Sequence, residues 1–235
     1  MIALIDYGAG NLTSVKKALT FLGADFAVPA SPAELREVRG VIVPGVGHFA
    51  ATAALEGAWY DAISAAAKAG TPLLGICLGM QWLFEGSDEA PELPGLGLLA
   101  GRCYRLGTVR LKPDTTEETV RLKPDTTDGD DGNKDDDSGS VRLQADRIKI
   151  PHVGWNSLAL QRDTSIVDGV DDGSQVYFTH SYVAPVTGDT VAVTEHGEAF
   201  AAVVQRGYIG GVQFHPEKSG EVGLQILRNF VELAG

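Results

Sequence analysis

The sequence predicts an α/β fold in which a mostly parallel sheet is covered by helices on both faces. In the first half of the chain, short apolar segments without polar alternation are separated by helical segments, as is typical of buried parallel strands. In the second half, strand-like segments follow one another at short spacing until a final helix. The chain has 235 residues, of which 44% are hydrophobic and 7% aromatic, so we expect an aliphatic core.

The first half predicts alternating strands and helices. Asn11 is a suitable N-cap for a first helix that ends at Gly23, and Gly70 ends a later Ala-rich helix. Ser31 and Glu34 form a capping box with proline at the first helical position. We expect strands at residues 2–6, 25–28, 40–43 and 73–76, and helices at 12–22, 59–69 and 78–84.

The second half predicts a set of strands and one closing helix. We expect strands at residues 147–150, 157–160, 175–179, 190–195, 200–205 and 210–213, and a helix at about 220–233. We therefore predict one domain over residues 1–235, interrupted by an insertion.

The insertion is repetitive and acidic. Residues 109–116 and 120–127 both read VRLKPDTT, and a frayed copy, VRLQAD, occupies 141–146. Residues 112–140 contain ten acidic and four basic side chains. Asp128, Asp130 and Asp131 offer oxygen ligands for Ca²⁺, but no glutamate closes a twelve-residue loop after Gly132. We expect a disordered insertion at about 107–146, because it has little apolar surface to bury.

Composition excludes several classes of protein. A net charge of −12 gives no electrostatic footprint for nucleic acid or for an anionic membrane. No run of about 18 apolar residues is present, and the N-terminus lacks the basic region of a signal peptide. Cys77 and Cys103 cannot build a disulfide framework. We expect a cytoplasmic protein with reduced thiols and no membrane or nucleic-acid partner.

Cys77 is the strongest candidate for a catalytic residue. The segment Gly-Ile-Cys-Leu-Gly, residues 75–79, follows an apolar strand and opens a helix, which is the pattern of a nucleophile elbow. The glycines permit a sharp turn, and the helix N-terminus favours the thiolate. The alternative is a buried structural cysteine, which is the commonest fate of a free thiol.

His215 and Glu217 are candidates for the base and its orienting carboxylate. His215 follows the strand at 210–213, so we expect it at the carboxyl edge of the sheet, where ligand sites of open α/β sheets lie. Glu217 can accept a hydrogen bond from the imidazole and stabilise its charged form. The alternatives are a surface turn and a zinc deaminase, but the latter also needs a Pro-Cys-x-x-Cys segment that the chain lacks.

Two glycine-rich turns follow other strands. The segment Pro-Gly-Val-Gly-His-Phe, residues 44–49, can direct backbone N–H groups toward the same edge, as an oxyanion hole requires, or it can be a simple tight turn. The segment Gly8-Ala9-Gly10 is a partial dinucleotide fingerprint, but Thr13 replaces its third glycine, so that assignment is weak.

With these pieces in place, the chain resembles the class I, triad-type glutamine amidotransferases, and among them the glutaminase subunits of imidazole glycerol phosphate synthases. The resemblance is carried by the segments at residues 6–11, 44–49, 75–81, 151–156, 178–182 and 213–219, which together span the chain outside about 107–146. It implies a flavodoxin-like fold with a mostly parallel central sheet, flanking helices and an added antiparallel sheet.

The resemblance also implies roles for individual residues. Cys77 would be the nucleophile, His215 the general base and then acid, and Glu217 the orienting carboxylate. Backbone groups of Val46, Gly47 and Leu78 would form the oxyanion hole. The implied substrate-binding residues are Gln81, Glu89, His180 and Ser181, and the implied partner-facing residues are Asn11, Trp155, Tyr177 and Lys218.

The implied activity is glutamine hydrolysis through a glutamyl thioester, without a cofactor or metal. The implied partner is a (β/α)₈-barrel cyclase, which would use the ammonia to form imidazole glycerol phosphate and an aminoimidazole carboxamide ribonucleotide. Two alternatives stay open: the glutaminase of a different amidotransferase, and a glutamine-binding regulatory subunit without catalysis. The intact residues Cys77, His215 and Glu217 argue against the second.

Overall fold

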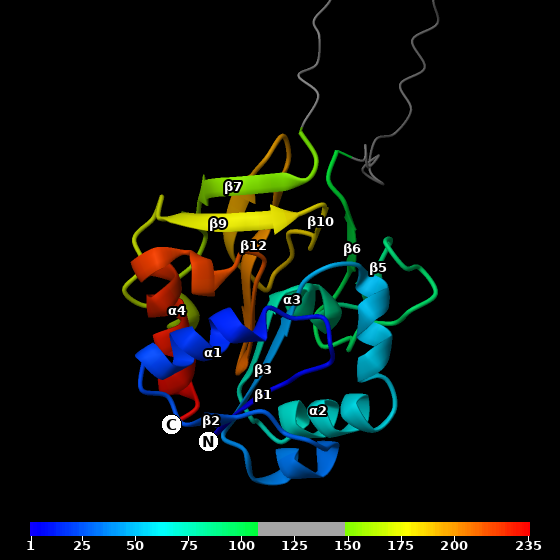
Figure 1. Ribbon diagram of the computed structural model, residues 1–235. Coiled ribbons are helices and arrows are strands. Elements are labelled where there is room, and N and C mark those ends of the chain that lie inside the picture. The colour runs from blue at the N-terminus through cyan, green and yellow to red at the C-terminus, as the bar shows by residue number, and fades with distance from the viewer. Residues whose placement is uncertain (108–148) are drawn as a thin grey trace, which may run out of the picture. The chain divides into compact units, whose positions relative to one another are not determined.

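The computed structural model describes residues 1–107 and 149–235 (Figure 1). Its main feature is an eight-stranded sheet with the order β2-β1-β3-β4-β13-β12-β11-β8. The first five strands in that order run parallel, and β12, β11 and β8 are antiparallel to their neighbours. The strands are β1 (Ile2–Leu4), β2 (Phe26–Ala27), β3 (Gly40–Gly45), β4 (Leu73–Cys77), β8 (Ala159–Leu160), β11 (Thr190–Glu195), β12 (Ala199–Arg206) and β13 (Ile209–Val212).

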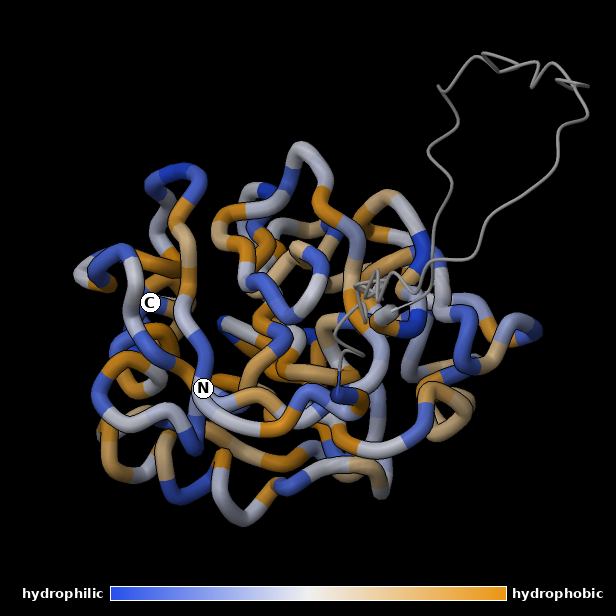
Figure 2. The backbone as a smooth tube through the Cα atoms, turned by 90° about the horizontal axis from the view of Figure 1, so that it is seen from above, coloured by the Kyte–Doolittle hydropathy of each residue, from blue (hydrophilic) through white to orange (hydrophobic). Residues whose placement is uncertain are grey.

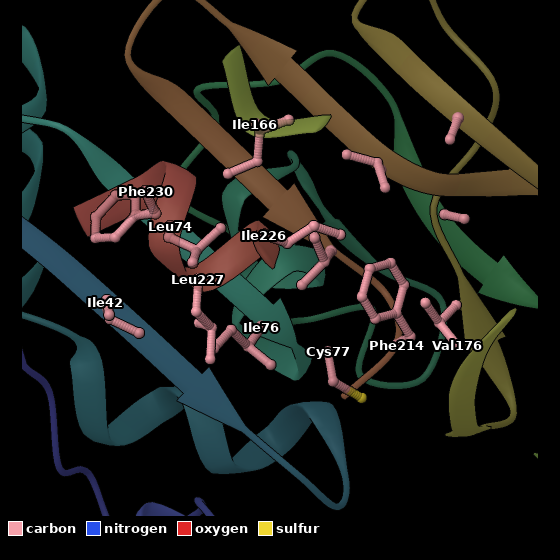
Figure 3. Close-up of a cluster of buried hydrophobic side chains, with 14 of the residues drawn as sticks. Ile42, Leu74, Ile76, Cys77, Ile166, Val176, Phe214, Ile226, Leu227 and Phe230 are labelled. Carbon is pink, nitrogen blue, oxygen red and sulfur yellow. The ribbon is translucent and has the colours of Figure 1, made fainter. Parts of the chain in front are cut away.

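Helices cover both faces of this sheet. Helices α1 (Leu12–Phe21) and α4 (Gly220–Leu233) pack on one face, and α2 (Ala58–Lys68) and α3 (Leu78–Leu83) lie on the other (Figure 1). Successive strand residues enter opposite cores, so Ile42 packs with the α4 residues Leu227 and Phe230 (Figure 3), whereas Val41 and Val43 pack on the other side. This burial on both faces explains why the first strands are uniformly apolar, and it confirms the predicted fold class.

The helix ends follow the predicted signals. The Asn11 side chain caps α1 by accepting a hydrogen bond from the Ser14 N–H, and Gly23 and Gly70 adopt positive φ after α1 and α2. The capping box at residues 31–34 is present, but it opens a 3₁₀ helix, Pro32–Glu37, rather than an α-helix. The turns that project furthest from the body are largely hydrophilic, as Figure 2 shows. Within the described residues, no helix is both long enough and apolar enough to cross a membrane.

Two smaller sheets lie beyond the main one. β7 (His152–Ser157) pairs antiparallel with β9 (Gln175–His180), and a three-stranded sheet joins β5 (Gly86–Ser87), β6 (Arg102–Arg105) and β10 (Tyr182–Val183). The short strands β5, β6 and β10 have too few residues to show a period-2 pattern in the sequence.

The prediction of a strand at 147–150 is wrong for residues 149 and 150, which are not in a strand. The strand begins at His152 instead, after Pro151, which has no N–H to donate to a ladder. From residue 108 to residue 146 the expected insertion lies outside the described residues, as do the candidate calcium ligands within it.

Candidate active site

Cys77 stands at the carboxyl end of β4, where the chain turns into α3. Its φ of 53° makes it the one non-glycine residue with positive φ among the residues that the structure describes. Two glycines make the turn possible: a Cβ at Gly75 would lie 2.6 Å from the Gly79 carbonyl oxygen, and a Cβ at Gly79 would collide with the Val43 carbonyl oxygen. This strained, tightly packed turn confirms the shape of a nucleophile elbow.

His215 reaches the same edge from the neighbouring strand. β13 runs parallel to β4, with Val212 opposite Ile76, and His215 follows three residues later. Its Nδ1 lies 3.0 Å from Glu217 Oε1, and both side chains are at most 2% exposed. Because this bond occupies Nδ1, the tautomer is fixed and Nε2, which has no other hydrogen-bond partner among the described residues, is left for proton transfer.

The electrostatics of His215 favour its charged form. Burial lowers the pKa of His215, but the interactions of the ring with Cys77 and then Glu217 outweigh burial and raise the pKa to about 9. The imidazole is therefore protonated at neutral pH. The ring interacts with both Cys77 and Glu217, which links the three side chains.

Gln213 is a site residue to which sequence reasoning gave no role. Its Nε2 donates to Cys77 Sγ at 3.6 Å, and its Oε1 accepts from Gln81 Nε2 at 3.2 Å. Gln81 Nε2 also donates to the Tyr182 carbonyl at 2.9 Å, so Gln81 ties the elbow helix to the opposite wall of the site. The sequence could have indicated this residue, because Gln213 stands only two residues before His215, at the same end of a strand. In Figure 3, the Cys77 side chain lies at the margin of the hydrophobic cluster, beside Phe214.

A cavity of about 260 Å³ opens beside the thiol. All four predicted substrate-binding residues line it, together with backbone of the predicted oxyanion segment; the full lining is Gly47, Cys77, Leu78, Gln81, Glu89, Pro151, Thr179, His180, Ser181 and Tyr182. Glu89 brings a carboxylate, and its Oε2 accepts a hydrogen bond from the Phe49 N–H at 2.7 Å. The cavity therefore combines a nucleophile, an anionic group and backbone polar groups in a volume suited to a small amino acid.

His180 is buried in the cavity wall and is uncharged. Its Nε2 lies 3.2 Å from His152 Nδ1, and its Nδ1 has no hydrogen-bond partner among the described residues. Burial, followed by the proximity of His152, lowers the pKa of His180 well below its ordinary value. Burial, followed by the proximity of His196, lowers the pKa of His152 to about 4. His180 therefore lines the cavity wall as a neutral ring.

The predicted oxyanion segment has a different arrangement from the expected one. The Val46 N–H donates to the Ala9 carbonyl at 2.6 Å, so this donor is occupied and is not directed at the nucleophile. Gly47, with a φ of +95°, and Leu78 both line the cavity. An oxyanion hole formed by Val46, Gly47 and Leu78 stays a prediction, and in this structure the Ala9 carbonyl accepts the hydrogen bond of the Val46 N–H.

Three of the four predicted partner-facing residues form one surface cluster, which we call the aromatic patch: Trp155, Tyr177 and Lys218. Trp155 is 57% exposed and meets Tyr177 edge to face with 6.1 Å between ring centroids. Lys218 Nζ lies 5.9 Å from the centre of the Tyr177 ring. The fourth residue, Asn11, caps α1. Across the described residues, no group of three or more His, Cys, Asp or Glu side chains could hold a metal ion.

Comparisons with known proteins agree with this geometry. The family model "Glutamine amidotransferase class-I" matches residues 3–233. The chain is 43% identical to the imidazole glycerol phosphate synthase subunit HisH of Geobacillus thermodenitrificans, covering 98% of this chain and 95% of that protein. It is 40% identical to the subunit of the same name from Halobacterium salinarum, covering 98% and 92%.

Solved structures support the fold. A crystal structure titled as a glutamine amidotransferase superposes with a TM-score of 0.66 at 19% identity and covers the whole of both chains. PurLQS from Thermotoga maritima gives a TM-score of 0.65 at 16% identity, with 98% of this chain and 97% of that chain covered.

Proposed function

The chain belongs to the class-I glutamine amidotransferase family, and from that membership we propose that it is the glutaminase subunit of an imidazole glycerol phosphate synthase, an enzyme of histidine biosynthesis. The observation that carries the proposal is the unit of Cys77, His215 and Glu217 beside a cavity of amino-acid size. The choice of synthase is supported by relatives that are about 40% identical over nearly the whole chain.

The reaction begins at Cys77. The thiolate attacks the side-chain amide carbon of glutamine, and His215 passes its proton to the departing ammonia, which leaves a glutamyl thioester. His215, now neutral, takes a proton from water as the water attacks the thioester, and glutamate is released with the thiolate restored. Glu217 keeps its hydrogen bond to His215 Nδ1 and holds the ring in the orientation that both steps require.

The cavity wall positions the substrate. Glu89 would receive the α-ammonium group of glutamine, and the backbone near Ser181 would bind the α-carboxylate. Gln81 and His180 complete the wall; because Gln81 already donates to Tyr182, its contribution is to hold the wall in place as well as to meet the ligand.

The aromatic patch and Asn11 are proposed to contact a (β/α)₈-barrel cyclase that consumes the ammonia. Tyrosine and tryptophan are enriched at the centres of protein interfaces, and Trp155 is 57% exposed. In the cyclase, ammonia would react with a phosphoribulosyl-formimino nucleotide to give imidazole glycerol phosphate and aminoimidazole carboxamide ribonucleotide.

We further propose that the Gly45–Val46 peptide gates hydrolysis. With its N–H bonded to Ala9, one oxyanion donor is missing, and a rotation of this peptide would supply it. Docking of the cyclase with its nucleotide would favour the rotated form, so that ammonia is released only when an acceptor is present.

Reconstitution tests the proposed function. The purified chain is mixed with the candidate cyclase and the nucleotide, and formation of imidazole glycerol phosphate is followed with glutamine or with an ammonium salt as nitrogen source. We expect glutamine to support synthesis only when the chain is present, whereas ammonium supports it with the cyclase alone. A chain that adds nothing to synthesis from glutamine would refute the proposal.

A further inference from the structure

Tyr7 carries a buried hydroxyl for which the proposed mechanism has no use. It follows β1 at the same edge of the sheet as Cys77, and its Oη is inaccessible to solvent and has no hydrogen-bond partner among the described residues. Burial, followed by the negative charge of Cys77, raises the pKa of Tyr7, so the group is a neutral O–H close to the nucleophile. A buried donor without an acceptor destabilises the conformation in which it occurs, so another conformation that supplies an acceptor would be favoured.

The hydroxyl lies against the peptide that is proposed to rotate. A Cβ built on Gly45 would collide with Tyr7 Oη and would lie 2.8 Å from the Cβ of Leu78. Tyr7 Oη therefore occupies the space beside Gly45 Cα, between the end of β3 and the elbow. Gly45 is itself paired with Cys77 in the sheet, so this space lies next to the nucleophile's strand end.

Rotation of the peptide would bring an acceptor to this region. The N–H and C=O of a trans peptide point in opposite directions, so turning the Val46 N–H away from Ala9 turns the Gly45 carbonyl toward the loop that follows β1. The Ala9 carbonyl, which now accepts from Val46, would repel that oxygen. The rotated carbonyl therefore needs a donor, and Tyr7 O–H is adjacent to it.

We infer that Tyr7 is a positioning residue whose hydroxyl donates to the Gly45 carbonyl in the rotated, active form. The inference rests on the proposed function and on the gate described above. The two forms then differ in their hydrogen bonds. In the resting form the Val46 N–H donates to the Ala9 carbonyl, and in the active form the Tyr7 hydroxyl donates to the Gly45 carbonyl. Removing the hydroxyl would weaken only the active form.

The test is Tyr7→Phe, which keeps the ring and removes the donor. Tyr60→Phe is the matched control, because Tyr60 is a partly buried tyrosine whose Oη donates to the Leu96 carbonyl at 3.4 Å, away from the cavity lining. For both variants and the wild type, glutaminase kcat and KM are measured for the subunit with the cyclase, before and after addition of the nucleotide. Melting temperature and the rate of Cys77 alkylation by iodoacetamide are measured on the same samples.

For Tyr7→Phe we expect the nucleotide-activated kcat to fall about tenfold, the effect of one lost hydrogen bond to a buried group. The KM for glutamine and the alkylation rate should stay within about twofold, and the melting temperature should not fall, because the resting form loses only an unpartnered hydroxyl. Tyr60→Phe should activate like the wild type.

Three outcomes would overturn the inference. An activated kcat equal to that of the wild type would show that the hydroxyl has no part in the active form. A fall that accompanies a lower melting temperature would indicate a structural role, and a changed alkylation rate would place the hydroxyl on the thiol instead. If the wild-type complex releases no ammonia from glutamine, the proposed function fails first, which separates that failure from the failure of Tyr7 alone.

Discussion

The ends of β3 and β4 are neighbours in the sheet, yet one is assembled for catalysis and the other is not. At the end of β4, Cys77 is fixed in a strained turn, and His215 beyond β13 is locked onto Glu217. At the end of β3, the Val46 N–H is bonded to Ala9 rather than directed at the nucleophile. We therefore propose that the fold alone holds the nucleophile in place, whereas stabilisation of the oxyanion depends on the orientation of the Gly45–Val46 peptide.

Packing explains why the end of β4 is fixed and the end of β3 is not. A rearrangement of the elbow is blocked by the contacts of Gly75 with Gly79 and of Gly79 with Val43. The β3 end has two glycines around Val46, and a Cβ at Gly47 would meet no other atom within 4 Å. The hydrogen bond from the Val46 N–H to the Ala9 carbonyl holds the Gly45–Val46 peptide in its present orientation, and we propose that binding of a partner releases it.

Loss of the proposed nucleophile at the end of β4 should have the most severe effect on activity. Cys77→Ala should lower kcat for glutamine hydrolysis by about 10⁴–10⁶, because the covalent intermediate is lost. Synthesis from ammonium salt by the complex should persist. Cys103→Ala is the matched control, because Cys103 is the other buried free thiol, and this variant should still hydrolyse glutamine. Loss of the ammonium-dependent reaction in Cys77→Ala would contradict this division of labour between the two subunits.

The two partners of the thiol should differ in importance. His215→Ala should be nearly as damaging as loss of the nucleophile, since His215 moves protons in both steps. Glu217→Gln should be about 100-fold milder, since the carboxylate only orients and stabilises the ring. The kcat values of both variants in the activated complex provide the measurement, and a reversed order would show that the roles are misassigned.

The raised pKa of His215 predicts how glutaminase activity depends on pH. Because the pKa of His215 is raised to about 9, the ring is protonated at neutral pH and loses its proton as the pH rises through about 9, and the departing ammonia then has no proton donor. We expect kcat/KM of the activated complex to fall above about pH 9. Glu217→Gln removes a group that raises this pKa, so the fall should move to lower pH. If kcat/KM of Glu217→Gln fell at the same alkaline pH as that of the wild type, Glu217 would have no influence on the pKa of His215.

The smallest effect is expected from deleting residues 112–140. This acidic, repetitive segment has little apolar surface to bury, and every residue that we place in the site lies outside it. Glutaminase activity and melting temperature should stay close to those of the full chain. A tenfold loss of affinity for the cyclase, measured by titration, would instead show that the segment takes part in docking and that control is not confined to the β3 end.

Much of the arrangement around Cys77, His215 and Glu217 was predictable from the sequence. An apolar strand, a Gly-x-Cys-x-Gly turn and a helix leave few conformations open to Cys77, and the strand before His215 places it at the same edge. The predicted substrate-binding residues came from the resemblance to known amidotransferases, and all of them line the cavity.

The arrangement at the end of β3 was less predictable, because it depends on contacts between segments that are far apart in the sequence. Nothing in the local sequence pairs Ala9 with Val46 or places the Tyr7 hydroxyl against Gly45. Gln213 was overlooked because a buried glutamine has no pattern of its own until its partners are known. The strand β7 escaped prediction because polar residues such as His152 and Asn156 obscure its alternation.

We propose that the triad is complete in the free subunit, whereas the Val46 N–H becomes an oxyanion donor only when the partner binds. Steady-state glutaminase activity tests this difference. Activity is measured for the subunit alone, with the cyclase, and with the cyclase and its nucleotide. We predict weak hydrolysis by the subunit alone and an increase of about 10²–10³ in kcat with both partners, the contribution of one correctly placed oxyanion donor. Equal activity in all three samples would contradict the claim and would make residues 44–49 a static part of the site.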